Sequence, residues 1–218
     1  CLPGAEEIDL GGRTLMPSFI DAHSHIGTFG SPFNIHFNAD LLLKQMEEFN
    51  IEKTILCSDG PHTNEETVAA FKAHPDKIIP LMWINCAEGK PAYDALEHYI
   101  RDEHFAGAKL QSLFDGYCAD DPCVDPVAEI CEKYGKPLFI HSGHPPFSLP
   151  WQIGLLAERH PHLPIVMIHM GHGNGMYVQA AIDMAKKYSN LYLETSGMPM
   201  HTKIKEAYEQ VGSDRIMW

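Results

Sequence analysis

The stretch IDAHSHIG, residues 20–27, places an aspartate and two histidines at alternate positions at the end of an apolar run. Because successive side chains of a β-strand point to opposite faces, Asp21, His23 and His25 are predicted to share one face and to converge on one object. Imidazole is a strong ligand for divalent metal ions, so the candidate object is a metal ion. No glycine-rich phosphate loop follows the run, which disfavours a doubly wound sheet.

Short apolar runs rich in β-branched residues recur at regular intervals from this stretch onward. They are SFIDAHSH, KTILCS, IIPLMWIN, FAGAKLQS, KPLFIHS, PIVMIH, NLYLETS and RIMW. Their continuous hydrophobicity is typical of parallel strands covered on both faces. Helical segments separate them, for example residues 125–135, with Asp125 as the predicted N-cap, Pro126 in the first turn and Gly135 as the terminator. Seven strand–helix units and the start of an eighth strand predict an α/β fold, a (β/α)8 TIM barrel.

The predicted barrel occupies residues 19–218 and is incomplete at its C-terminal end, where RIMW reads as the opening of strand eight. Residues 1–18 have the pattern of a turn, a short strand and a second turn, so we expect a β lead-in or the remnant of a small β-domain. Because the chain begins with Cys1 rather than methionine, we expect a fragment that lacks residues at both ends.

Composition narrows the kinds of partner. The 218 residues carry a formal charge of −13, whereas a surface that binds nucleic acid or an anionic membrane needs an excess of lysine and arginine. No apolar run approaches the ~18 residues that a membrane span needs. The six cysteines show neither zinc-ribbon pairs nor disulfide-scaffold density, so we expect free thiols in a reducing cytoplasm. The expected partner is a small molecule, and the sequence allows a homo-oligomer.

Four histidines lie where a barrel of this type has its active site, at the C-terminal ends of the predicted strands. His23 and His25 end strand one, His141 ends strand five and His169 ends strand six. Burying several imidazoles together without a shared partner would cost roughly 1–3 kcal/mol for each unsatisfied group. A shared metal ion with room for water explains the arrangement better than four separate core histidines.

Three further residues are candidates for contact with the substrate. His144 and His172 follow strands five and six and are predicted to border the pocket. Lys109 lies on strand four, and its direction cannot be fixed from the sequence. If it points inward it can pair with a substrate carboxylate or, after carbamylation, bridge two metals; if it points outward it reaches solvent or a neighbouring acid. The apparent absence of a carboxylate ligand on this strand favours one metal over two.

Four motifs together resemble a known family. They are IDAHSH after strand one, FIHSG on strand five, HMGHG on strand six and LETSG on strand seven. This combination is similar to the amidohydrolase superfamily, and most similar to its amidohydrolase-2 group, which includes aminocarboxymuconate semialdehyde decarboxylase-like enzymes. The resemblance covers nearly the whole chain. The stretch GGRTLMPSFIDAHSH separately resembles the entry into barrels that carry a small β-sandwich, so residues 1–18 are expected to be a lead-in or the remnant of such a domain.

The resemblance implies a role for each matching position. His23, His25 and His141 would be metal ligands, and His169 would lie beside the metal or the substrate as the catalytic histidine. The remaining ligand and base of the family is an aspartate at the end of strand eight, beyond Trp218.

The function expected from these residues is metal-dependent hydrolysis of an amide, lactone or ester by an activated water. The expected cofactor is one divalent ion, with zinc favoured and manganese, iron or cobalt as alternatives. Two other functions stay open: a non-oxidative decarboxylase of an unsaturated or aromatic acid, and a non-catalytic ligand-binding barrel. Asp21 is expected to support strand one rather than to act on the substrate.

Overall fold

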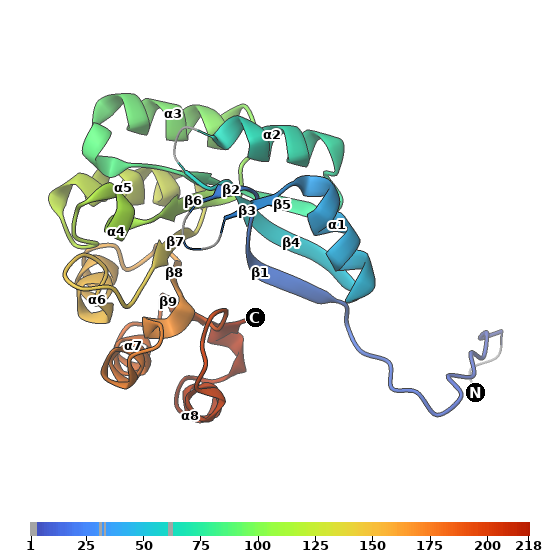
Figure 1. Cartoon of the computed structure of the whole chain (residues 1–218). Helices are drawn as coiled ribbons and strands as arrows, with labels where there is room; N and C mark the ends of the chain where they lie inside the picture. The colour runs from blue at the N-terminus through green and yellow to red at the C-terminus, as the bar shows by residue number, and fades with distance from the viewer. Residues whose placement is uncertain (1–3, 31, 33, 61–62) are drawn as a thin grey trace.

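Eight parallel strands form the centre of the computed structural model, which describes residues 4–30, 32, 34–60 and 63–218 (Figure 1). In sheet order they are β1 (Phe19–His25), β4 (Ile51–Cys57), β5 (Ile78–Trp83), β6 (Gly107–Leu110), β7 (Leu138–His141), β8 (Ile165–Ile168), β9 (Leu191–Glu194) and β10 (Ile216–Met217). The backbone N–H of Ala22 on β1 donates to the carbonyl of Trp218, just after β10, over 2.9 Å. The sheet is therefore a nearly closed barrel, and the predicted TIM barrel is confirmed.

Helices alternate with the strands and cover the outside of the barrel (Figure 1). They are α1 (Ala39–Glu48), α2 (Asn64–Ala73), α3 (Lys90–Arg101), α4 (Ser112–Asp115), α5 (Asp125–Tyr134), α6 (Pro150–Arg159), α7 (Gly175–Lys187) and α8 (His201–Val211). As predicted, α5 ends at Gly135 in the left-handed conformation. The predicted N-cap Asp125 was wrong, since the cap is Val124. The Asp125 carboxylate instead binds Arg159 and His160 on the neighbouring helix and its C-cap.

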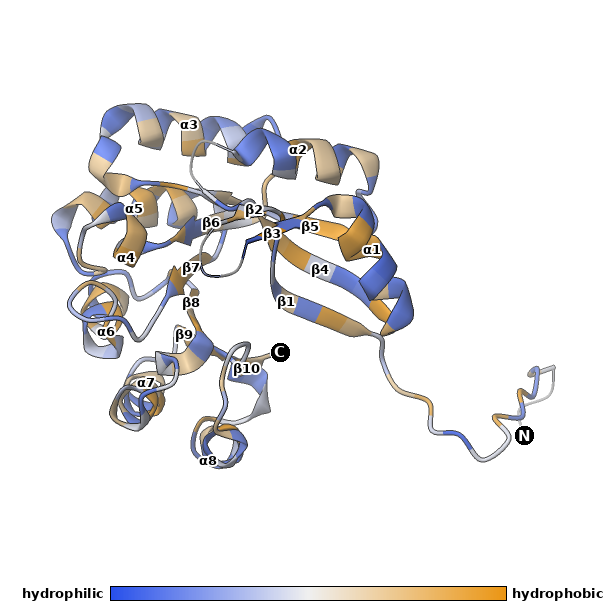
Figure 2. Ribbon diagram, in the orientation of Figure 1, coloured by the Kyte–Doolittle hydropathy of each residue, from blue (hydrophilic) through white to orange (hydrophobic). Residues whose placement is uncertain are grey.

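The core has two layers, one between the strands and the helices and one inside the barrel. Figure 2 shows apolar residues along the strands and on the helices that cover them. On β6, Ala108 and Leu110 pack in the outer layer. Since neighbouring residues of a strand face opposite sides, Lys109 between them points into the barrel. The inner layer is made of Ala22, Ile55, Cys57, Leu81, Phe139, Val166 and Ile168.

Two features lie outside the regular barrel. A short antiparallel hairpin of β2 (Gly27–Phe29) and β3 (Ile35–Phe37) follows β1. Residues 4–18 form neither helix nor strand and extend away from the barrel (Figure 1). The short strand predicted within residues 1–18 is therefore absent from the described part, and the division into a lead-in and a barrel stays a prediction. Among the described residues, no helix has the length and apolar character to cross a membrane.

Candidate active site

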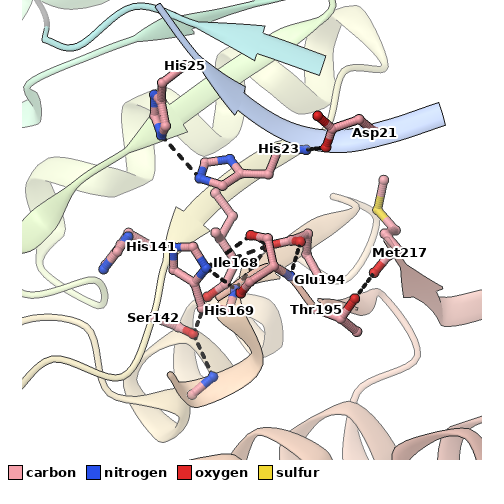
Figure 3. A network of polar contacts seen from close by, with 12 residues as sticks. Asp21, His23, His25, His141, Ser142, Ile168, His169, Glu194, Thr195 and Met217 are labelled. Atoms are coloured by element: carbon pink, nitrogen blue, oxygen red, sulfur yellow. Dashed lines mark hydrogen bonds and ion pairs between the residues drawn. The ribbon is translucent and has the colours of Figure 1, made fainter. Parts of the chain in front are cut away.

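Four imidazoles from three strands meet at the C-terminal end of the barrel (Figure 3). His23 and His25 lie on β1, His141 ends β7, and His169 begins the 3₁₀ turn η3 (His169–Gly171) directly after β8. Ring centroids are 4.6 Å apart for His23 and His25, 5.2 Å for His23 and His169, and 4.8 Å for His141 and His169. The barrel thus brings together residues that are more than a hundred positions apart in the sequence.

The two histidines of β1 present their Nε2 atoms to one another at 3.1 Å. Two metal–nitrogen bonds of about 2.0–2.1 Å would span this separation at an angle of about 100°, which fits two ligands of one ion. The Nδ1 of His25 lies 3.2 Å from the carbonyl of Ser58. A proton donated there leaves the Nε2 lone pair of His25 free for a ligand.

The third predicted ligand is oriented differently. The Nε2 of His141 lies 2.9 Å from the Nδ1 of His144, whose ring lies 4.6 Å from that of His172. Within the part of the chain that the structure describes, no three histidine, cysteine, aspartate or glutamate side chains already form a metal site. For His141 to act as a metal ligand, its Nε2 must therefore release His144 and bind the ion instead.

Burial keeps these imidazoles neutral. It lowers the pKa of His25 to about 3 and that of His169 to about 4, and it holds the pKa values of His23 and His141 well below the ordinary value of 6.5. The charge of Lys109 lowers all four pKa values further. Neutral imidazoles keep a nitrogen lone pair, so the donor set fits a divalent metal ion.

Lys109 is the unusual group of this site, because it is fully buried and its amine has no hydrogen-bond partner among the described residues. Desolvation lowers its pKa to about 8, and nearby Cys57 and Glu194 oppose that shift. Most of the amine is still protonated at neutral pH. A buried cation without hydrogen bonds is costly, so the site favours an anionic ligand.

Hydrogen bonds connect the loop after His141 to the loop that carries His169. The hydroxyl of Ser142 donates to the carbonyl of Ile168 over 2.6 Å and accepts from the N–H of Gly171 over 2.8 Å (Figure 3). A Cβ on Gly143 would lie only 2.3 Å from the carbonyl oxygen of Gly171.

The second of these loops is also strained. His169, Met170 and His172 all have positive φ angles, of +63°, +34° and +58°. Strained backbone of this kind persists where the surrounding contacts fix it, and it is frequent at functional sites.

The sequence did not reveal the support of His169 by the end of β9. The buried carboxylate of Glu194 accepts from the backbone N–H of His169 over 3.1 Å and from the hydroxyl of Ser196 over 2.8 Å. The Nδ1 of His169 lies 2.7 Å from the carbonyl of Ser196. A glutamate that ends an apolar strand, followed two residues later by serine, is the signal that could have identified this support.

Asp21 lies apart from the cluster, as Figure 3 shows. Its carboxylate accepts from the N–H of His23 over 3.0 Å and from the hydroxyl of Thr54 on β4 over 3.3 Å. The pairing of β1 with β4 is irregular between Asp21 and Ser24, which breaks the simple alternation expected from the sequence. Asp21 therefore supports β1, in agreement with its expected role.

Residues 33–218 match the amidohydrolase family profile, which is most of the chain. The chain belongs to the amidohydrolase family. The family resemblance read from the strand-end motifs is thereby confirmed, and three of the four motifs, FIHSG, HMGHG and LETSG, lie within the matched residues.

One curated protein matches this chain in sequence, and it is a decarboxylase. The 2-amino-3-carboxymuconate-6-semialdehyde decarboxylase of Dictyostelium discoideum is 26% identical over an alignment of 137 residues that covers 53% of this chain and 38% of the relative. The matched part therefore spans about two fifths of that relative's length.

Solved structures share the fold. The 2,6-dihydroxybenzoate decarboxylase from Rhizobium has a TM-score of 0.70 at 18% identity, covering 92% of this chain and 86% of that one. The 5-carboxyvanillate decarboxylase from Novosphingobium aromaticivorans, complexed with manganese and a nitrobenzoic acid, has a TM-score of 0.74 at 16% identity, covering 92% and 84%. At these identities, the likeness shows the fold alone.

These comparisons correct the expected reaction. Hydrolysis of an amide, lactone or ester was the leading expectation, and it was wrong, because the curated relative that matches in sequence is a decarboxylase. The strand-end histidines and a divalent ion are compatible with either reaction, so the sequence did not decide between them.

Proposed function

We propose that this amidohydrolase is a metal-dependent, non-oxidative decarboxylase of an aromatic or unsaturated carboxylic acid. The observation that carries the proposal is the buried amine of Lys109, which has no hydrogen-bond partner among the described residues and lies within electrostatic reach of all four strand-end imidazoles. A substrate carboxylate would supply the missing hydrogen-bond partner. The decarboxylase relative supports the same choice of substrate class.

His23, His25 and His141 would hold one divalent ion, through the facing Nε2 atoms of the first two and the Nε2 of the third. Two structural neighbours contain manganese, so manganese joins zinc as a candidate, and the expectation of zinc stays a prediction. When bound, such an ion acts as a Lewis acid that polarises a substrate oxygen. The two β1 nitrogens already have the separation that one ion requires.

The remaining residues would bind the substrate and move the proton. Decarboxylation breaks the bond between the carboxyl carbon and the adjacent carbon, leaves the electron pair on that adjacent carbon, and requires a proton to replace carbon dioxide. Because Nδ1 of His169 is engaged by Ser196, its Nε2 is the atom that can accept a proton from water and pass it to that carbon. His144 and His172, whose rings lie 4.6 Å apart beside His141, would contact the rest of the substrate.

The test is release of carbon dioxide from a panel of hydroxybenzoates and muconate-type acids by the protein loaded with manganese or zinc. We expect release that matches substrate loss and stops when the metal is chelated. A His169→Gln variant should keep its metal, measured by elemental analysis, and lose activity. Bound metal without release from any acid in the panel would contradict the proposal and leave a non-catalytic ligand-binding barrel.

A further inference from the structure

A buried carboxylate at the end of β9 has no part in the reaction described above. Glu194 has no exposed surface, and both of its oxygens face the turn that carries Ser196 and the backbone of His169. We propose that Glu194 is a positioning residue that acts through Ser196 to fix the tautomer and orientation of the His169 ring. The catalytic value of this positioning rests on the proposed role of His169.

In its hydrogen bonds with the described residues, Glu194 acts only as an acceptor. Its Oε2 accepts from the N–H of His169 over 3.1 Å and from the hydroxyl of Ser196 over 2.8 Å, and its Oε1 accepts from the N–H of Ser196. Burial raises the pKa of Glu194 above its ordinary value, although these hydrogen bonds and the charge of Lys109 act in the opposite direction. Three donors on two oxygens match an ionised carboxylate and leave no place for a donor on Glu194 itself.

The turn that Glu194 holds in place determines which nitrogen of His169 carries the proton. The Nδ1 of His169 lies 2.7 Å from the carbonyl oxygen of Ser196 and 3.1 Å from its hydroxyl. A carbonyl oxygen can only accept, so Nδ1 carries the hydrogen and Nε2 keeps its lone pair. A histidine whose Nδ1 is fixed in this way has a defined proton-accepting atom on its other side.

The ring also packs directly against this turn. Gly197 has a φ of +64°, and a Cβ at this position would lie 3.1 Å from the Nδ1 of His169. The close approach leaves little room for the ring to rotate about its bond to the backbone. Glu194, Ser196 and Gly197 thus restrain both the tautomer and the direction of His169.

Glu194→Gln is the informative substitution because it keeps the size of the side chain and replaces one acceptor oxygen by an NH₂ donor. That donor would face an N–H or O–H donor in either orientation of the amide. Ser196→Ala removes only the hydroxyl and is the milder second variant. Thr195→Val is the matched control, since the Thr195 hydroxyl bonds the carbonyl of Met217 and not His169.

The experiment measures the imidazole ¹⁵N shifts of His169 in metal-free protein at pH 7, assigned by loss of the signals in His169→Gln. We expect the Nδ1–H tautomer in the wild type and in Thr195→Val. Glu194→Gln or, if it does not fold by circular dichroism, Ser196→Ala should lower the Nδ1–H fraction. An unchanged tautomer in the variant that folds would overturn the proposal.

Kinetics give a second measurement. Glu194→Gln should lower kcat about 10- to 100-fold, the usual effect of removing a group that orients a catalytic histidine, with metal content unchanged. Glu194→Asp, which keeps the carboxylate, should recover part of the loss. If the wild type released no carbon dioxide, the proposed function would fail, whereas the ¹⁵N measurement would still decide the role of Glu194.

Discussion

For Lys109, the sequence predicted the strand on which the residue lies but not the direction of its side chain. The alternation of side chains along that strand could place Lys109 either inside the barrel or outside it, and the sequence did not decide between the two faces. The outer-layer packing of Ala108 and Leu110 settles the face and turns Lys109 toward the imidazoles. The supporting role of Glu194 was not predicted for a related reason. It depends on a contact with the backbone of His169, which follows a different strand.

Replacing Lys109 tests its role in binding the substrate carboxylate. A charged hydrogen bond contributes about 1.5–3 kcal/mol, so Lys109→Met should raise KM about 10- to 100-fold for a carboxylic acid. The measurement is steady-state carbon dioxide release at saturating metal. Lys44→Met, on the exposed face of α1, is the control and should leave KM unchanged. An unaltered KM in Lys109→Met would show that the substrate carboxylate binds elsewhere.

The buried imidazoles also predict how the stability of the metal-free protein depends on pH. The pKa values of His25 and His169, about 3 and 4 in the folded protein, lie below the 6.5 expected after unfolding. Between pH 6.5 and 4 the unfolded chain therefore binds more protons, and the free energy of unfolding falls as the pH falls. Each group contributes at most about 1.4 kcal/mol per pH unit.

Urea unfolding at pH 7, 6 and 5 measures this slope, after chelation of any metal. His25→Phe should make the dependence shallower, because one titrating group is removed. A free energy of unfolding that stays constant over this range in the wild type would contradict the burial of neutral imidazoles.

At the scale of elements, the strand runs were predictable because each is apolar and continuous, and all eight appear in the sheet. The β2–β3 hairpin was missed, since three-residue strands are too short to show a period. The misplaced N-cap at Asp125 has another cause, because two groups on a neighbouring segment compete for its carboxylate. The apolar pattern of the sequence thus located the strands, whereas contacts between elements decided features such as the helix cap near Asp125.

The contact between the loops after β7 and β8 can be tested with two glycines. Gly143 and Gly116 have similar φ angles, of +88° and +80°, but only at Gly143 would a Cβ meet other atoms, 2.3 Å from the Gly171 carbonyl. Alanine at either position costs about 1–2 kcal/mol for the left-handed backbone. Gly143→Ala should cost about 1–3 kcal/mol more for the overlap.

Chemical unfolding of the two variants gives the difference directly. Equal losses in Gly143→Ala and Gly116→Ala would show that the two histidine loops are not packed as tightly as the structure describes. The outcome matters for the site, because this contact helps to set the separation of His141 and His169.

At the scale of the whole molecule, the barrel explains why histidines far apart in sequence meet at one end. The resemblance of four motifs identified the family and the fold, whereas the reaction could not be predicted, since hydrolysis and decarboxylation share these residues. The protein is acidic, with a formal charge of −13, so the cation of Lys109 buried inside the barrel is an exception to its overall charge. Formation of a homo-oligomer and the division of the chain into a lead-in of residues 1–18 and a barrel stay predictions.

The most direct measurement is a crystal structure of the protein with manganese and an unreactive aromatic acid, using the anomalous signal of the metal. We predict a metal peak about 2.0–2.2 Å from the Nε2 atoms of His23 and His25, and a carboxylate of the acid within hydrogen-bond distance of the Lys109 amine. A metal bound away from these histidines, or an acid whose carboxylate avoids Lys109, would contradict it.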